Sequence, residues 1–328
     1  MKVLVTGADG LLGANLVRAL LADGYEVRAF VMRDSKARTL DGLEAEIVQG
    51  DLLDEDPSVL NAALRGCGAV LHCAGLTDMR APDALMWRVN SEGTRRVVEA
   101  SVRAGVGRFI HTGSASSFRY GSKESPGDER SGFPLAYKGV AYAESKADAS
   151  KHVLDRVACD GLDAVVVAPT FMLGAFDERP SSGELIRQFV RRNMRFTSPG
   201  GRNFAHVGDV ARGMVSALQR GRTGETYLLG GTNVSYLEFF ALVARAVGRE
   251  PPRLVLPKAV VLAAGSAGSA VQAISRRPAA LNRTMARMAC MGTYYDSSKA
   301  ITELSMPQTS LEQAIDESVQ ALREYGHI

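Results

Sequence analysis

Short apolar runs alternate with segments of helical periodicity through the first half of the chain. Runs of five or six residues rich in aliphatic side chains predict buried strands at 2–6, 27–32, 45–49, 69–73, 108–112 and 164–168. Apolar residues that recur with a period of about 3.6 residues predict helices at 11–22, 57–64, 83–104 and 142–159. Strands and helices that alternate at this spacing indicate a parallel sheet covered by helices on both faces.

After Pro169 this alternation stops. The pattern predicts helices at 185–192 and 207–220, and then a strand at 226–229 that returns to the sheet. Beyond a break at Pro251-Pro252 the remaining pattern is mostly helical. We therefore expect a large first domain and a smaller second one.

Three glycines follow the first strand and open the first helix, with the spacing Gly7-x-x-Gly10-x-x-Gly13. Glycine permits a tight turn at the strand end. At the helix start it lets a pyrophosphate approach backbone N–H groups and the positive end of the helix dipole. We therefore place Gly7, Gly10, Leu11 and Leu12 in a dinucleotide site.

The predicted fold is α/β, with a doubly wound parallel sheet of the Rossmann type and a second, smaller, mostly helical C-terminal domain. We assign 1–169 to the dinucleotide-binding domain and expect 203–232 to return to it. The discontinuous substrate-binding domain then comprises 170–202 and 233–328. A crevice between two domains is the natural place for a substrate.

The end of the second strand bears on the choice of cofactor. NAD sites usually carry an acidic residue there, whereas Arg33 stands at this position, with Lys36 and Arg38 beyond it. A cation can pair with the 2′-phosphate of NADP. We expect NADP, and NAD stays the alternative because Asp34 follows directly.

Further cofactor contacts are expected at the ends of the other strands. Asp51 and Leu52 follow the third strand, where adenine contacts would fall. Cys73, Ala74 and Gly75 end the fourth strand, where small side chains would admit the cofactor.

Composition and charge exclude several classes of function. Of the 328 residues 46% are hydrophobic and 23% charged, and a net charge of +3 gives no reason to expect nucleic acid as a partner. The four cysteines form no Cys-x-x-Cys pair and have no histidines at zinc spacing, so we expect no metal. The N-terminus lacks the pattern of a signal peptide, which favours a cytoplasmic location.

The segment 259–275 carries no charged residue. It is slightly short for a membrane span and is broken by glycines, so membrane insertion is not expected. A helix that covers a pocket or a subunit interface is the preferred interpretation. With 181–202, it is expected to form the far wall of the substrate crevice.

Together these segments resemble the extended short-chain dehydrogenase/reductases, and the resemblance spans nearly the whole chain. It rests on the glycine motif, Asp51-Leu52, 72–75, Val89-Asn90-x-x-Gly93-Thr94, Ser114, Tyr142-x-x-x-Lys146 and Pro169, in that order. Segments 24–29 and 204–211 look most like the dihydroflavonol-reductase-like branch. The resemblance implies a nicotinamide-dependent oxidoreductase with cofactor contacts at Tyr142, Lys146 and Pro169, and a homodimer.

Tyr142 and Lys146 lie four residues apart, on one face of a predicted helix. A free tyrosine has a pKa of about 10, and a neighbouring ammonium favours the phenolate and lowers that pKa. A second pair with the same spacing, Tyr295 and Lys299, lies in the C-terminal domain, which we expect to be far from the strands that carry the cofactor. Only Tyr142 has the position between Ser114 and the sixth strand that the family requires.

Ser114 follows the fifth strand, and its hydroxyl can orient a substrate oxygen beside Tyr142. Capping of a turn is the other interpretation, and Ser116 is an alternate that also faces the substrate. The predicted reaction is hydride transfer between nicotinamide and a carbon that bears oxygen, in which Tyr142 moves the proton.

Two enzyme hypotheses and one regulatory hypothesis compete for the substrate. We favour a carbonyl reductase of the dihydroflavonol-reductase type, because the acidic residue of NAD sites and the Asp-Glu pair of dehydratases are missing. A nucleotide-sugar epimerase or dehydratase with retained NAD is the alternative, since Arg202 resembles an arginine that contacts a diphosphate in UDP-sugar epimerases. We expect Arg202 to reach the crevice and Arg191, Arg192 and Arg195 to be solvated. A dinucleotide-sensing regulator is the least favoured, because such proteins usually lose the catalytic tyrosine or lysine.

Overall fold

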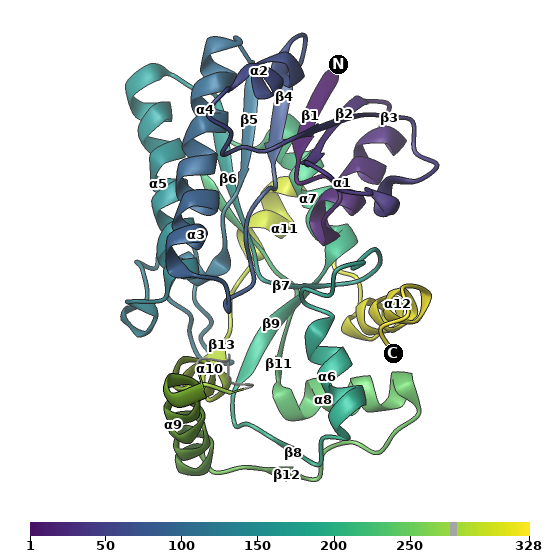
Figure 1. Ribbon diagram of the computed structural model, residues 1–328, viewed down its shortest axis with the longest axis vertical. Helices are drawn as coiled ribbons and strands as arrows, with labels where there is room; N and C mark the ends of the chain where they lie inside the picture. The colour runs from purple at the N-terminus through teal and green to yellow at the C-terminus, as the bar shows by residue number, and fades with distance from the viewer. Residues whose placement is uncertain (276–280) are drawn as a thin grey trace.

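A seven-stranded parallel sheet forms the centre of the first part of the chain in the computed structural model, which describes residues 1–275 and 281–328 (Figure 1). Its strand order is β10-β6-β5-β4-β1-β2-β3. The strands are β1 (Lys2–Thr6), β2 (Glu26–Met32), β3 (Ala45–Gly50), β4 (Ala69–His72), β5 (Arg108–Thr112), β6 (Ala164–Pro169) and β10 (Thr226–Leu229). The predicted α/β fold is confirmed, and so is the late strand that returns to the sheet beside β6.

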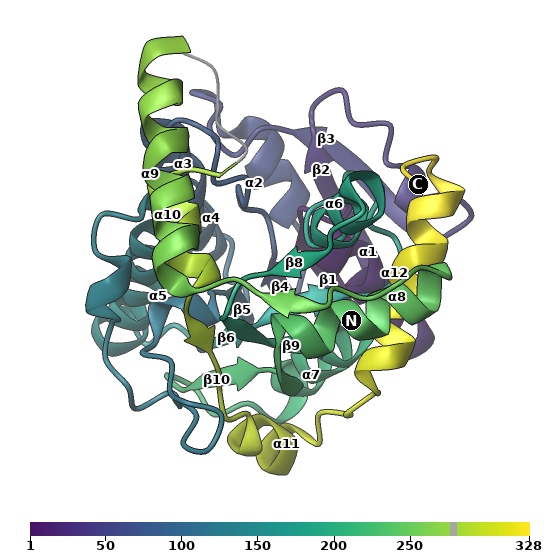
Figure 2. The ribbon, with the colours of Figure 1, turned by 90° about the horizontal axis from the view of Figure 1, so that it is seen from below.

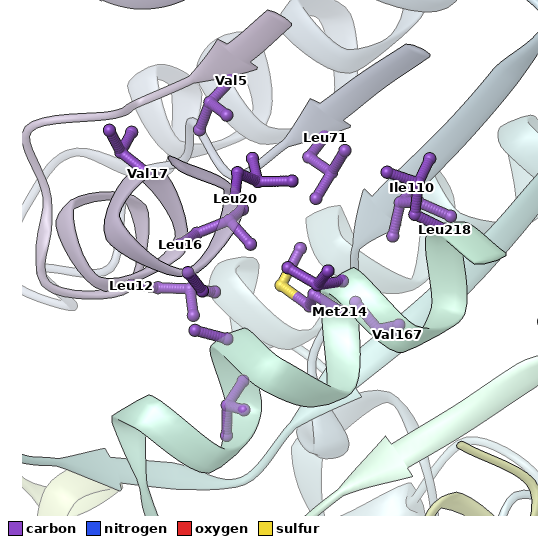
Figure 3. Close-up of a cluster of buried hydrophobic side chains, with 14 of the residues drawn as sticks. Val5, Leu12, Leu16, Val17, Leu20, Leu71, Ile110, Val167, Met214 and Leu218 are labelled. Carbon is purple, nitrogen blue, oxygen red and sulfur yellow. The ribbon is translucent and has the colours of Figure 1, made fainter. Parts of the chain in front are cut away.

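Helices cover both faces of this sheet (Figures 1 and 2). On one face α1 (Leu11–Ala22) packs against α7 (Val207–Arg220), and on the other lie α2 (Ser58–Leu64), α4 (Gly93–Arg103) and α5 (Ala141–Asp160). Figure 3 shows the first of the two resulting cores, where side chains of β1, β4, β5 and β6 meet those of α1 and α7. Burial on both faces explains why these strands are continuously apolar in sequence.

The helix predicted at 83–104 is not continuous. It consists of α3 (Asp83–Trp87), a π-helical turn at Arg88–Glu92 (η2) and α4. A single π turn inserts one residue into the helical repeat, which re-aims the side chains on either side of it. Asn90 lies in this turn, is fully buried and faces the edge of the sheet where the strands end.

The second half of the chain contains a small sheet that the sequence did not predict. Strand β9 (Gly201–His206) pairs with β7 (Phe171–Leu173), β11 (Thr232–Ser235) and β13 (Gly292–Thr293), while β8 (Phe196–Thr197) pairs with β12 (Leu254–Val255). The helices around them are α6 (Glu184–Arg192), α8 (Tyr236–Val247), α9 (Lys258–Ser275), α10 (Arg283–Ala289), α11 (Ser298–Leu304) and α12 (Leu311–Glu324). A separate aromatic and aliphatic core joins α6, α8 and α12 to β9.

Helix α9 contains the uncharged segment 259–275. It packs against α10, and only Val261 and Gly265 of the helix are buried. Within the described residues, no helix has the length and apolar character to cross a bilayer.

Candidate active site

The glycine-rich turn between β1 and α1 lies tightly against the end of β4. Gly7 has a φ of +64°, and a Cβ there would lie 2.7 Å from the Cα of Ala74. A Cβ on Gly13 would overlap the carbonyl oxygen of Gly7 and lie 2.7 Å from the Cα of Ala8. Gly10 is the N-cap of α1 and makes no side-chain hydrogen bond to the first turn, so the N–H groups of this turn can bind a phosphate.

The other predicted cofactor residues collect at the same edge of the sheet, because parallel strands all end there. These residues end or follow β2, β3, β4 and β6: Arg33, Asp51, Leu52, Cys73, Ala74, Gly75 and Pro169. All strands of the sheet are parallel, but β2 and β3 are added on one side of β1 and β4, β5 and β6 on the other, so the strand order reverses between β1 and β4. Open α/β sheets bind ligands at such switch points. The arrangement can therefore hold a dinucleotide stretched across the ends of the strands.

A polar cluster beside the glycine turn was missed in the sequence. The carboxylate of Asp9 is almost fully buried, and it accepts hydrogen bonds of 2.6 Å from Ser35 Oγ and from the guanidinium of Arg179. Arg179 comes from the loop after β7, so this contact joins the second half of the chain to the cofactor edge. Arg33 lies nearby, exposed on 59% of its side chain, and forms an ion pair of 2.5 Å with Asp54.

Ser114, Tyr142 and Lys146 come together where β5 ends and α5 begins. The hydroxyl of Tyr142 donates to Ser114 Oγ at 3.4 Å, and Ser114 Oγ lies 2.8 Å from Ser116 Oγ. Lys146 is one helical turn further along and donates from Nζ to the carbonyl oxygen of Thr112 at 2.7 Å. Ser114 also caps the short helix Ala115–Ser117 by accepting from the N–H of Ser116, which confirms the capping interpretation, and its hydroxyl lies within reach of Tyr142.

Burial controls the protonation of this cluster. Removal from water raises the pKa of the Tyr142 phenol, whereas the hydrogen bond between Tyr142 and Ser114 and the charge of Arg202 lower it. Burial also lowers the pKa of Lys146 to about 8. The expected lowering of the pKa of Tyr142 by Lys146 is thus not found, because the Lys146 ammonium points to Thr112 instead of the phenol. At neutral pH Tyr142 therefore carries its proton and can donate it.

Asn90 holds the turn after β4 against α5. Its amide oxygen accepts from the N–H of Leu76 at 2.7 Å, and its Nδ2 donates to the carbonyl of Leu76 and to Ser145 Oγ. A Cβ on Gly75 would lie 3.1 Å from this amide oxygen and 3.3 Å from Lys146 Nζ. These hydrogen bonds engage both polar groups of the Asn90 side chain, which fixes the backbone beside Lys146.

The second Tyr-x-x-x-Lys pair lies nearer to the site than expected. Tyr295 packs against Ala115 and Ala168, which follow β5 and lie in β6, so its predicted remoteness from the cofactor strands is wrong. The phenol donates to the carbonyl of Phe118 at 3.2 Å, and burial raises its pKa well above the usual value. Lys299 does not approach the phenol but binds Glu225 and the carbonyl of Thr226.

Arg202 lies in a pocket of about 190 Å³ between β7, β9, α6 and α8. Its Nε donates to the Tyr236 hydroxyl at 2.7 Å, and its guanidinium lies 4.9 Å from the centre of the Phe171 ring. The pocket is lined by Phe171, Ser181, Glu184, Leu185, Gln188, Arg202 and Tyr236. No carboxylate within the described residues forms an ion pair with Arg202.

One of the two segments that were predicted to form the far wall of the substrate crevice lines this pocket. Segment 181–202 contributes five residues to the pocket, namely Ser181, Glu184, Leu185, Gln188 and Arg202. Helix α9 contributes none, because its buried positions face α10. Arg191, Arg192 and Arg195 are exposed, so Arg202 alone of the four arginines reaches this pocket.

Comparison with known proteins identifies the family of this chain. Residues 3–230 match the model of the NAD dependent epimerase/dehydratase family. The chain belongs to this family. It is therefore an enzyme of NAD-dependent oxidoreduction, and the predicted relation to the extended short-chain dehydrogenase/reductases is confirmed.

Similar proteins include reductases and epimerases. The chain is 33% identical to a "Putative dihydroflavonol 4-reductase" of Synechocystis, over 99% of this chain and 95% of that one. It is 34% identical to "Sterol demethylase protein B" of Methylococcus capsulatus over the full length of both. The crystal structure of a nucleoside-diphosphate-sugar epimerase from Pseudomonas aeruginosa superposes with a TM-score of 0.81 at 26% identity, over 100% of this chain and 99% of that one.

Proposed function

We propose that the enzyme is an NADP-dependent reductase that transfers hydride to the carbonyl carbon of a largely hydrophobic substrate. The cofactor supplies the hydride. Tyr142 gives the proton to the carbonyl oxygen, Ser114 donates a hydrogen bond to that oxygen, and Lys146 holds the nicotinamide ribose. Ser116 lies beside Ser114 and is the second hydroxyl that can face the substrate.

The observation that carries this proposal is the hydrogen bond from Tyr142 to Ser114 in a site that keeps the phenol protonated. When hydride adds to a carbonyl, negative charge develops on the oxygen, and a proton donor aligned with a second hydroxyl stabilises it. Tyr142 and Ser114 thus supply the proton and the hydrogen bond that reduction of a carbonyl requires. Two similar proteins, from Synechocystis and Methylococcus, are named for a dihydroflavonol and a sterol, which supports a hydrophobic ring compound as the substrate class.

The nucleotide that the purified enzyme carries tests the reaction class. A reductase binds exchangeable NADP, and the enzyme should oxidise NADPH when it is given a dihydroflavonol or a 3-ketosteroid as a probe. Denaturation should release no stoichiometric NAD. Tightly bound NAD, with no net oxidation of NADPH by either probe, would instead identify an enzyme that returns the hydride to its substrate.

Preference for NADP is proposed from Arg33 at the end of β2. Arg33→Ala should weaken NADPH binding by about tenfold or more and change NADH binding little, because a charge-assisted bond to phosphate is worth about 1.5–3 kcal/mol. Calorimetric titration of both cofactors measures this. Arg38→Ala is the matched control, since Arg38 is equally exposed but lies near Glu178. Tighter NADH than NADPH binding in the unmodified enzyme would refute the preference.

A second candidate, a nucleotide-sugar epimerase with retained NAD, is favoured by the burial of Arg202. An arginine that is desolvated, lacks a carboxylate partner within the described residues and lines a pocket can bind a diphosphate. Glu184 lines the same pocket and would repel such a group, although it is engaged with Arg187. This opposition is the reason for ranking the epimerase second.

Arg202→Ala distinguishes anionic from uncharged substrates. For a substrate with a phosphate or carboxylate in this pocket, KM should rise by about 10- to 100-fold, while cofactor affinity stays unchanged. Steady-state kinetics with an anionic and an uncharged probe measure the difference. Arg191→Ala, an exposed arginine of α6, is the control and should change neither KM.

A further inference from the structure

Charge is distributed unevenly over the last third of the chain. The whole sequence has 39 basic and 36 acidic residues, yet the stretch 251–295 contains no aspartate or glutamate. It contains the following basic residues: Arg253, Lys258, Arg276, Arg277, Arg283 and Arg287. Basic and acidic residues are mixed in the rest of the sequence, whereas this stretch has only basic ones. They flank the segment 259–275, which carries no charge.

Helix α9 exposes an apolar stripe on the side away from α10. Val260, Val271 and Ile274 are exposed by 50%, 60% and 86%, and Ala263 and Ala267 lie between them at helical spacing. The other side of the helix is used for packing. There Val261 and Gly265 are buried, and a Cβ on Gly265 would overlap Ala286 of α10. Exposure of the Val260, Val271 and Ile274 side chains to water is unfavourable, and an exposed apolar patch indicates an interaction surface.

Further apolar side chains are exposed on the β8–β12 ribbon, which precedes α9 in the chain. Strand β12 leads directly into α9, and its Leu254 and Val255 are exposed by 59% and 43%, as is Phe196 of β8 by 49%. Figure 1 shows α9, β8 and β12 in the lower part of the view, away from the large sheet. We call this surface the apolar end, which comprises Phe196, Leu254, Val255, Val260, Val271 and Ile274.

Exposed cations lie on the segments that carry the apolar end and on α10, which packs against the other side of α9. They are Arg195, Arg253, Lys258, Arg283 and Arg287. Among the described residues only Arg253 of this group has an ion pair, with the exposed Glu250. Apolar side chains with unpaired cations around them are the combination that binds the interface of an anionic membrane.

We propose that the apolar end docks on the surface of an anionic lipid membrane without crossing it. The valines, Ile274 and Phe196 would enter the boundary of the acyl chains, and the cations would face the lipid phosphates. A second copy of the chain fits this surface less well, because two such surfaces face to face would bring like charges together, and among the described residues only Arg253 of these cations has a carboxylate partner, Glu250. The inference goes beyond the proposed reductase activity and does not depend on it.

The experiment measures binding to vesicles. The full chain is mixed with vesicles of phosphatidylcholine alone or with phosphatidylglycerol, and the bound fraction is determined by flotation. We expect binding to the anionic vesicles, little to the neutral ones, and weakening when salt is raised. The double variant V271E/I274E should bind at least about tenfold more weakly, because two carboxylates would face the lipid phosphates. Leu135→Glu, which changes a side chain that is exposed by 87% elsewhere, should bind like the unmodified chain.

Cofactor titration and thermal unfolding distinguish a loss of vesicle binding from a loss of folding or of cofactor binding. V271E/I274E should retain the cofactor affinity and melting temperature of the unmodified chain, since neither residue lies in the cofactor site or the core. Failure of every reductase assay would therefore leave the vesicle result intact. Equal vesicle binding by V271E/I274E, or no binding of the unmodified chain to anionic vesicles, would overturn the proposal. A dimer in light scattering that V271E/I274E dissociates would assign the surface to a second copy instead.

Discussion

Tyr142→Phe should reduce turnover by about 10²- to 10⁴-fold while leaving the fold and cofactor affinity unchanged. The phenol donates a hydrogen bond to Ser114, and its replacement by phenylalanine removes one oxygen from a site that is otherwise intact. The developing alkoxide would then depend on Ser114 and water for its proton. Steady-state rates with NADPH and a carbonyl probe, together with calorimetric cofactor titration, measure both effects.

Tyr295→Phe is the matched control for this prediction. Tyr295 has the same spacing to a lysine and is also buried, but its hydroxyl is committed to the carbonyl of Phe118. The loss of this bond should cost about 1 kcal/mol of unfolding free energy and change turnover only slightly. A normal rate in Tyr142→Phe combined with an inactive Tyr295→Phe would move the acid–base role to Tyr295.

The sequence was sufficient for the large sheet because its strands are buried on both faces. Their apolar runs are therefore continuous, and the glycine turn after β1 is fixed by backbone constraints that only glycine meets. The spacing of Tyr142 and Lys146 placed both on one side of α5, and β5 brings Ser114 to them. In each case a local pattern determines the contact.

What the sequence did not predict depends on contacts between distant segments. The strands of the small sheet are two to six residues long and only partly buried, so they leave no clear periodicity. The contact of Arg179 with Asp9 joins residues 170 positions apart. The direction of the pKa shift of Tyr142 depends on where Lys146 points, and the helical spacing does not contain this information.

Gly10→Ala and Gly13→Ala should separate cofactor binding from folding. A Cβ on Gly10 meets only the Gly7 carbonyl oxygen at 3.4 Å, an ordinary contact, so the variant should fold with little loss of stability. The new methyl group would occupy the space where a pyrophosphate approaches the start of α1. Affinity for NADPH should therefore fall by at least about tenfold, which corresponds to about 1.4 kcal/mol.

Gly13→Ala should act on the fold itself. Its Cβ would overlap the backbone of Gly7 and Ala8, which cannot yield as a flexible side chain would, so α1 must move away from the turn. Overpacking of this kind costs about 1–3 kcal/mol, and a clash with backbone belongs at the upper end. Denaturant unfolding should show a lower midpoint for Gly13→Ala and an unchanged one for Gly10→Ala. If both variants unfold like the unmodified enzyme and both bind NADPH normally, the turn between β1 and α1 is not where the pyrophosphate binds.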